Sequence, residues 1–337
     1  MDSFRTADYH TAGEPFRIVS DLGLELTGDT VAERRVNAMN SAAVERARQI
    51  LCFEPRGHAD MYGGFITAPD DAGAHFGVLF WHKDGFSTAC GHGTIALGVW
   101  AVETGRVPAP STGSTEVVID VPSGRVTARV HTEDGRITGV DFVNVASYLL
   151  AIDVPVATSL GELFVDVSYG GAIYAQLGVA TVGLSVTPAN VAALIELGRE
   201  IKWALNDSAV AQHPSDPRLS GIYGTILFEN LAVGPHGSLT QRNVTIFADG
   251  ELDRSPCGSG SCARVATLDH TGQLGAGGVL THRSIVGSTF TARVAARTIA
   301  DGRPAVLPEV SGMAYKTGES SFTVDPYDPL VPGFVLR

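Results

Sequence analysis

A short pattern that could carry chemistry occurs twice in the sequence. Residues 90–96 read Cys-Gly-His-Gly-Thr-Ile-Ala, and residues 257–263 read Cys-Gly-Ser-Gly-Ser-Cys-Ala. The leading cysteines, Cys90 and Cys257, are 167 residues apart (257 − 90) in a chain of 337 residues. Glycines let a backbone approach a ligand closely, and Ser or Thr can cap the first turn of a helix. Each pattern therefore predicts a thiol at a helix N-terminus, where free N–H groups attract anions and lower the pKa of the thiol.

Two such thiols could move a proton at a carbon atom next to a carboxylate. The carboxylate must be held by hydrogen-bond donors that strengthen as negative charge develops on it. The natural donors are the backbone N–H groups of Gly91, His92, Gly258 and Ser259. One thiol, as the thiolate, would remove the proton, and the other would return a proton to the opposite face. The stereocentre would be inverted without a cofactor.

Other residues near the second pattern have a functional and a structural interpretation. Asp253 lies four residues before Cys257, where its carboxylate would suit the amine of an amino acid, but it could instead pair with Arg254. Cys52 and Cys262 stand outside the repeated position, and buried packing is the usual role of such a cysteine.

Polar clusters elsewhere in the first half are equally open. His92 could serve only as a helix-cap residue. His10 and Glu14, and likewise His58 and Tyr62, lie in turn-rich segments and could either shape a pocket wall or stabilise loops.

Composition excludes several classes of protein. The net charge of −12 argues against nucleic acid or an anionic membrane as a partner. The chain has no apolar run of 20 residues and no apolar signal core near its N-terminus, so we predict a cytoplasmic protein. Neither Cys-x-x-Cys nor His-Glu-x-x-His occurs, so no zinc site is expected.

The order of predicted elements is similar in the two halves, with strands, a Cys-Gly turn, a buried helix and further strands. This order predicts a duplicated α/β unit, with the active site in the cleft between the halves and a boundary near residue 145. Helices are predicted over residues 30–48, 93–104 and 187–206 and from residue 262 to 268, with Thr187 as an N-cap and Pro188 at the first helical position. Strands are predicted at 17–20, 78–81, 164–167, 223–228, 244–247, 305–307 and 321–324, and a hairpin at 115–130.

Four segments together resemble the proline racemase family, which includes proline racemases, 4-hydroxyproline 2-epimerases and trans-3-hydroxy-L-proline dehydratases. They are His-Thr-Ala-Gly-Glu-Pro-Phe-Arg at 10–17, His-Ala-Asp-Met-Tyr-Gly-Gly at 58–64, Ala-Cys-Gly-His-Gly-Thr at 89–94 and Asp-Arg-Ser-Pro-Cys-Gly-Ser-Gly at 253–260. The resemblance runs from about residue 8 to the C-terminus.

The resemblance implies a diaminopimelate-epimerase-like fold of two pseudo-symmetric α/β (α+β) domains, each a barrel-like sheet around a central helix. Residues 1–145 with about 317–337 would form the first domain, and residues 146–316 the second. Neither pyridoxal phosphate nor a metal is expected, and a homodimer is implied. Position by position, Cys90 and Cys257 match the two catalytic thiols, and Asp253 matches the residue that contacts the ring nitrogen. The carboxylate cradle matches Gly91, His92, Gly258 and Ser259.

Two features of the resemblance point to different reactions. Residues 247–253 and 312–318 are more similar to the 3-hydroxyproline dehydratases, which typically carry Thr where this chain has Cys257. A racemase or epimerase needs an acid on each face of the substrate, and Cys257 supplies the second. The main prediction is therefore a racemase or epimerase of proline or hydroxyproline, and the alternative is a trans-3-hydroxy-L-proline dehydratase, with or without epimerase activity.

Two other classes of protein compete with this prediction. A thiol redox protein would use closely spaced cysteines, and that spacing is absent. A non-catalytic imino-acid binding protein would keep the carboxylate donors without needing two thiols.

Overall fold

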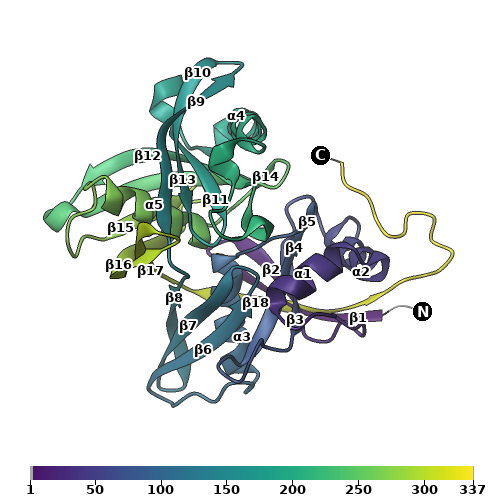
Figure 1. Ribbon diagram of the computed structural model, residues 1–337. Helices are drawn as coiled ribbons and strands as arrows, with labels where there is room; N and C mark the ends of the chain where they lie inside the picture. Colours follow the sequence, from purple (N-terminus) through teal and green to yellow (C-terminus); the bar gives the residue numbers. More distant parts are fainter. Residues whose placement is uncertain (1–2, 337) are drawn as a thin grey trace. The chain divides into compact units, whose positions relative to one another are not determined.

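The computed structural model describes residues 3–336 of the chain. It comprises two compact units, one formed by Met1–Val140 with Met313–Arg337 and the other by Asp141–Gly312. Both units combine a mixed sheet with few helices (Figure 1).

The first unit is built on a mixed sheet, in which some neighbouring strands are parallel and others antiparallel. β1 pairs with β18 and with β2 in antiparallel fashion, and β2 then pairs with β3 in parallel. β3 and β4 are antiparallel, β4 and β6 parallel, and β6 and β7 antiparallel. The bounds are β1 Ser3–Thr11, β2 Glu14–Val19, β3 Gly63–Thr67, β4 Phe76–His82, β5 Gly85–Phe86, β6 Gly113–Val121, β7 Gly124–Glu133, β8 Arg136–Val143 and β18 Ala314–Thr323; the helices are α1 Val31–Met39, α2 Ala42–Cys52 and α3 Gly91–Glu103.

The second unit repeats this succession of pairings. β10 pairs with β9 and β11 in antiparallel fashion, and β11 then pairs with β12 in parallel. β12 and β13 are antiparallel, β13 and β15 parallel, and β15 and β16 antiparallel. The bounds are β9 Tyr148–Thr158, β10 Gly161–Tyr169, β11 Ile173–Gly178, β12 Ile222–Val233, β13 Leu239–Phe247, β14 Glu251–Leu252, β15 Leu280–Ser284, β16 Thr289–Ala300 and β17 Arg303–Gly312; the helices are α4 Val191–Leu205 and α5 Gly258–His270.

One central helix is almost entirely buried in each unit. α3 packs against β1, β2, β6, β7 and β18, and α5 packs against β9, β10, β11, β16 and β17. Every residue from Gly91 to Ala101 in α3, and from Gly258 to Leu268 in α5, is buried. A helix buried on most faces is what the apolar and small residues after Cys90 predict. The predicted pseudo-symmetric α/β fold is therefore confirmed.

The predicted long helix over 30–48 is wrong, because the chain forms two helices there. α1 begins with a capping box between Thr30 and Glu33 and ends at Asn40, whose side-chain amide donates to the carbonyl oxygen of Val36. Ser41 then adopts an extended conformation and caps α2. Asn and Ser side chains compete for backbone hydrogen bonds, which ends one helix and starts the next while the apolar spacing continues.

Two other helix boundaries also differ from the prediction. Residues 188–190 form a 3-10 turn and the α-helix begins at Val191, so Thr187 precedes the turn without a side-chain cap. α5 begins at Gly258, four residues before the predicted start, because the glycines of the repeated pattern are themselves helical. No helix within residues 3–336 combines the length and the hydropathy that crossing a membrane requires.

Gly98 marks the closest approach of α3 to β7. A Cβ atom there would stand 2.6 Å from the Cβ of Ala128. In an open helix Gly→Ala adds about 1 kcal/mol of stability. Here we expect Gly98→Ala to lower the free energy of unfolding by about 1–3 kcal/mol through overpacking, as measured by urea denaturation. Gly139→Ala is the control, because a Cβ at Gly139 meets no atom within 4 Å; a stabilised Gly98→Ala variant would contradict this packing.

Candidate active site

Cys90 caps the N-terminus of α3 with its own sulfur. Its backbone is extended, with φ −154° and ψ 101°, and the N–H of Gly93 donates to the Sγ atom at 3.2 Å. The hydroxyl of Thr94 donates to the Cys90 carbonyl at 2.8 Å and fixes the same turn. A hydrogen bond to sulfur and the positive end of a helix both favour the thiolate form. Cys90 is thus held in place by hydrogen bonds to its sulfur and to its carbonyl oxygen.

His92 lies beside this thiol and is neutral. Its Nδ1 and Nε2 atoms are 3.5 and 3.6 Å from Sγ of Cys90. The imidazole packs edge-on to Tyr62 and Phe16, with ring centroids 5.0 and 5.8 Å away. Burial lowers the pKa of His92 to about 3, although a hydrogen bond with the Pro15 backbone acts in the opposite direction. A neutral imidazole therefore forms a polar wall beside the thiol.

Cys257 stands at the corresponding position of α5 in a different backbone conformation. Its φ is 63° and its ψ 110°, which is uncommon for any residue other than glycine. Burial raises the pKa of the Cys257 thiol well above its ordinary value, and the carboxylate of Asp253 raises it further. The hydroxyl of Thr245 and the backbone of Gly260 act in the opposite direction. This half-site therefore favours the protonated thiol.

Asp253 is buried in the turn that leads into α5. Its backbone N–H donates to the Thr245 carbonyl at 3.0 Å, and its carboxylate accepts from the Ser255 N–H at 2.8 Å. Burial raises the pKa of Asp253, and Ser255 and Cys257 partly offset this effect by hydrogen bonding. Arg254 donates to the carbonyl of Leu252, so its guanidinium stabilises the turn backbone. A buried carboxylate beside a thiol is a suitable partner for a substrate cation.

Tyr174, which the sequence analysis did not predict, joins Cys257 to Ser259. The Cys257 thiol donates to the Tyr174 hydroxyl at 3.9 Å, and that hydroxyl lies 2.7 Å from the Ser259 hydroxyl. Tyr174 comes from β11, and Tyr223 of β12 packs edge-on to it. The sequence alone gives no sign that this tyrosine has a functional role, because that role depends on the pairing of β11 with β12.

The first turns of α3 and α5 carry unpaired backbone donors. Across residues 3–336, the N–H groups of Gly91, His92, Gly258 and Ser259 have no hydrogen-bond acceptor. Buried N–H groups without acceptors are rare in proteins. They are the groups that bind a carboxylate at a helix N-terminus. All four predicted donors thus have the free N–H that a carboxylate requires.

The third residue after each cysteine must be glycine because the sulfur occupies the space that a side chain would need. A Cβ at Gly93 would stand 2.8 Å from Sγ of Cys90, and a Cβ at Gly260 would stand 2.8 Å from Sγ of Cys257. Real Cβ atoms do not approach so closely. The second glycine of the repeated pattern therefore makes room for the thiol.

The remaining sequence candidates divide between the site and the scaffold. Tyr62 is buried against His92, and Glu14 is fully buried on β2. His58 is exposed and accepts from the Asp60 N–H, and His10 accepts from the Gly13 N–H, so both order loops. Cys52 and Cys262 are fully buried, as packing cysteines are; Cys52 donates to the Met61 carbonyl, and burial raises the pKa of Cys262.

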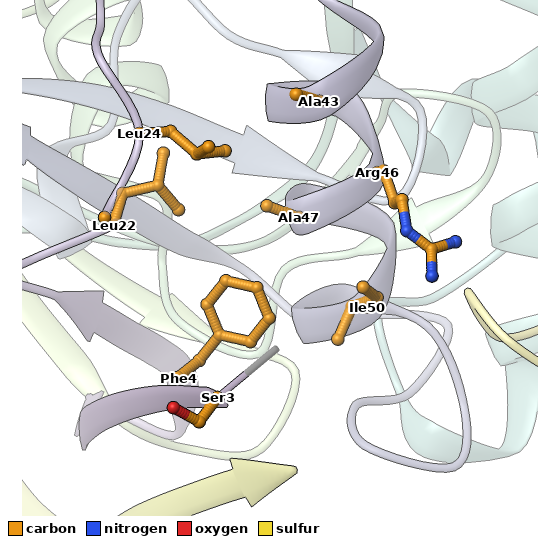
Figure 2. A pocket seen from close by; sticks show the side chains of 9 residues that line it. Ser3, Phe4, Leu22, Leu24, Ala43, Arg46, Ala47 and Ile50 are labelled. Carbon is orange, nitrogen blue, oxygen red and sulfur yellow. The ribbon is translucent and has the colours of Figure 1, made fainter. Parts of the chain in front are cut away.

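A separate apolar pocket in the first unit has none of these residues in its wall. It has a volume of about 330 Å³ and lies between β1, the loop at 22–24 and α2. In Figure 2, Phe4, Leu22 and Ile50 are among the side chains around it, and the guanidinium of Arg46 lies at its side. It offers no thiol and no unpaired helix N-terminus, so it is not the candidate active site.

A thiol at the start of a buried helix, repeated in two similar units, defines the class of two-domain epimerase-like enzymes. The family model described as "Proline racemase" matches residues 6–335. The chain therefore belongs to the proline racemase family, and its two α/β domains have the diaminopimelate-epimerase-like fold. The resemblance of the four sequence segments is confirmed.

Several relatives are similar over nearly their whole length. The trans-3-hydroxy-L-proline dehydratase of Burkholderia cenocepacia is 44% identical over 337 residues, with 99% of this chain and 98% of the relative covered. The 3-hydroxyproline 2-epimerase of Burkholderia multivorans is 44% identical over 336 residues, with the same coverage. A crystal structure of a hydroxyproline epimerase from Agrobacterium vitis, with bound trans-4-hydroxy-L-proline, has a TM-score of 0.90 and 30% identity, with 99% of this chain and 96% of that chain covered. The protein is thus an enzyme of a family with both isomerase and hydro-lyase members, as predicted.

Gly260 provides a test of the thiol position. Gly260→Ala would push a methyl group against Sγ of Cys257, and we expect kcat to fall about 100-fold, because a shift of about 1 Å in a reacting group has an effect of that size. Steady-state kinetics will measure this loss. Cys262→Ala, two residues further along the same buried helix, is the control and should retain activity. An unimpaired Gly260→Ala enzyme would place the sulfur elsewhere.

Proposed function

We propose that this enzyme inverts the Cα centre of hydroxyproline, with 3-hydroxyproline as its substrate, by proton transfer between Cys90 and Cys257. One observation carries the proposal. Each cysteine begins a buried helix whose first backbone N–H groups have no acceptor in residues 3–336. This arrangement occurs twice, and inversion of a carbon atom needs two proton-transfer groups.

The reaction begins with the removal of the Cα proton by a thiolate. The electron pair of the broken C–H bond moves into the carboxylate, which gains enediolate character. The N–H groups of Gly91, His92, Gly258 and Ser259 hold that charge, and such donors are most effective in a site without water. The second thiol then gives its proton to the opposite face of the carbon, so that the protonation states of the two cysteines are exchanged.

The two half-sites favour different protonation states before substrate binds. The Gly93 N–H and the N-terminus of α3 favour the Cys90 thiolate. Burial and the neighbouring Asp253 favour the Cys257 thiol. We therefore infer that Cys257 is the acid in the first turnover of the ligand-free enzyme, which leaves the role of the base to Cys90.

Asp253 would bind the substrate amine. Its buried carboxylate raises the pKa of Cys257, and a cationic amine beside it would cancel much of that effect. Substrate binding would thus bring the pKa of Cys257 back towards its ordinary value. Proton return in the reverse direction becomes easier as a result.

The proposed substrate rests on the relatives. Four relatives at 44% identity bear names that refer to 3-hydroxyproline, three as dehydratases and one as a 2-epimerase. The A. vitis structure, at 30% identity, holds trans-4-hydroxy-L-proline. The more similar relatives thus favour the 3-hydroxy compound.

Dehydration of trans-3-hydroxy-L-proline is the second candidate, and the dehydratase relatives favour it. In the trans isomer the Cα hydrogen and the 3-hydroxyl lie on the same face of the ring. One cysteine could remove the proton and return it to the departing hydroxyl, so that water and an enamine form, and the enamine rearranges to pyrroline-2-carboxylate. Elimination therefore needs one thiol, whereas inversion needs two.

Several other predictions belong to the same proposal. We propose the two compact units as the two catalytic domains, each carrying one thiol. A homodimer and a cytoplasmic location remain predictions from the sequence. The proposed proton transfers require only thiols and backbone donors, so the proposal includes no cofactor.

Proton NMR in D2O with L-proline, trans-4-hydroxy-L-proline and trans-3-hydroxy-L-proline tests the function. We expect the trans-3-hydroxy compound to lose its Cα signal and to yield the C2 epimer. Cys90→Ser should abolish both inversion and elimination, whereas Cys257→Thr should abolish inversion and retain any elimination. These effects follow from the number of thiols that each reaction needs.

Cys52→Ser and Cys262→Ser are the matched controls, since each removes one buried thiol. Both should still invert the substrate. Inversion that survives in Cys257→Thr would refute the two-thiol mechanism. Formation of pyrroline-2-carboxylate without any epimer would assign the enzyme to the dehydratases.

Asp253→Asn tests the electrostatic link to Cys257. The substitution removes the negative charge that raises the pKa of Cys257, so alkylation by iodoacetamide should shift to lower pH by about one unit or more. Epimerisation should nevertheless fall, because the substrate amine loses its partner. Mass spectrometry of the Cys257 peptide across a pH series measures the shift. Asp249→Asn is the control, because Asp249 lies in the turn before β14 and its carboxylate pairs with Arg199; it should leave the profile unchanged.

A further inference from the structure

Cys257 is held in a backbone conformation that most residues avoid. Its φ of 63° lies in the region that favours glycine, whereas Cys90 has an ordinary extended φ of −154°. Such a conformation is strained and persists only where the surrounding contacts determine it. Contacts specific to the second unit must therefore hold the backbone of Cys257.

The peptide group before Cys257 and the carbonyl after it are hydrogen-bonded. The Cys257 N–H donates to the Ser255 hydroxyl at 3.0 Å, and the Cys257 carbonyl accepts from the Ser261 N–H at 2.8 Å. The Pro256 carbonyl accepts from the side-chain amide of Asn243 at 2.8 Å and from the Ser261 hydroxyl at 3.2 Å. Two side chains from different elements thus fix the carbonyl immediately before the cysteine.

His282 extends this network from β15. Its Nδ1 atom lies 2.8 Å from the Ser261 hydroxyl oxygen, and the whole side chain is buried. Burial lowers the pKa of His282 to about 3, and the charge of Arg264 lowers it further, so the imidazole is neutral. The Ser261 hydroxyl has one hydrogen, which it donates to Pro256. His282 must then donate its Nδ1 hydrogen to Ser261, which fixes the tautomer.

The carbonyl before Cys90 is held differently, since that of Ala89 accepts from the hydroxyl of Ser87, two residues earlier, at 3.5 Å. Ala89 precedes Cys90, and Cys90 is fixed through its own sulfur and through Thr94. Any loss of the contacts around Pro256 should therefore affect only the chemistry of Cys257. An effect confined to Cys257 would therefore distinguish a positioning role from a general loss of stability, which would affect both cysteines.

We propose that Asn243, Ser261 and His282 are positioning residues that hold the Pro256 carbonyl and thereby aim the thiol of Cys257. They act through the backbone and do not touch the substrate. The proposal rests on the proposed function insofar as Cys257 is one of its two proton-transfer groups. Asn243 and His282 lie outside the repeated cysteine pattern. Ser261 lies within it, but not at a position expected to bind substrate.

Exchange of the Cα hydrogen for deuterium, followed separately from each 3-hydroxyproline epimer, tests this role. The two epimers direct their Cα hydrogens to opposite faces, so each thiol removes the hydrogen of one epimer. The epimer whose exchange is lost in Cys257→Ser is the one that reacts with Cys257. Ser261→Ala and His282→Leu should slow exchange from that epimer about 10-fold or more, because small displacements of a reacting group are costly. Exchange from the other epimer should change less than about 3-fold, because the position of the Cys90 thiol is unchanged.

His282→Asn is the rescue variant, since its amide can donate from nearly the position of Nδ1. It should restore exchange relative to His282→Leu. Ser168→Ala is the matched control, because Ser168 also contributes one buried hydroxyl, bonded to Thr267 at 2.6 Å, in the same unit. Ser168→Ala should not slow hydrogen exchange from one epimer more than from the other. Equal slowing of both epimers, or no slowing in Ser261→Ala, would overturn the positioning role.

Alkylation separates this inference from the proposed function. In the ligand-free enzyme, Ser261→Ala and His282→Leu should expose Cys257 and speed its reaction with iodoacetamide, while Cys90 and the Ser168→Ala control stay unchanged. If Cys257→Ser leaves exchange from both epimers intact, the two-thiol function fails. Faster alkylation of Cys257 would then still support the positioning role, and unchanged alkylation would refute it.

Discussion

Four backbone N–H groups at the starts of two buried helices are the constraint on which the rest of this structure depends. A helix always leaves its first N–H groups without intrahelical partners. Proteins normally expose these groups to water or cap them, since burial without an acceptor costs about 1–3 kcal/mol each. Here the donors of Gly91, His92, Gly258 and Ser259 are kept unpaired within residues 3–336. The sheets around α3 and α5 must therefore be stable enough to bury unpaired donors at the start of each helix.

The same constraint explains why the two half-sites are similar in sequence but differ in detail. Cys90 satisfies the Gly93 N–H with its sulfur in a relaxed backbone, so one helix terminus stabilises negative charge on the thiol itself. Cys257 lies beside the buried carboxylate of Asp253, which has the opposite effect. Two identical half-sites would favour the same protonation state in both thiols. In the proposed inversion one thiol acts as base and the other as acid, and the difference in local charge supports that division.

Much of this arrangement could be predicted from the sequence because the repeated pattern is local. A thiol, two glycines and a hydroxyl residue within five positions specify a helix start, and its repetition indicates a duplicated fold. The break at Asn40–Ser41 was missed because apolar spacing continues across it, while the deciding contacts are side chain to backbone. Tyr174, Asn243 and His282 were missed for another reason. They come from strands far along the chain, and only the parallel pairings of β11 with β12 and β13 with β15 place them around α5.

The central helices are held in different ways, and the strained cysteine accounts for the difference. The faces that α3 presents to its sheet are apolar, with Ile95, Leu97 and Val99 fully buried. α5 instead carries Arg264, whose guanidinium donates to Gln241 and Gln176 at 3.1 Å and lies 3.8 Å from the centre of the Phe228 ring. Apolar packing is non-directional and tolerates small rotations of a helix. Buried hydrogen bonds fix one orientation, because any rotation would leave polar groups unpaired. A helix that must keep its N-cap cysteine at a φ of 63° needs that directional support, whereas a helix that begins with a relaxed cysteine does not.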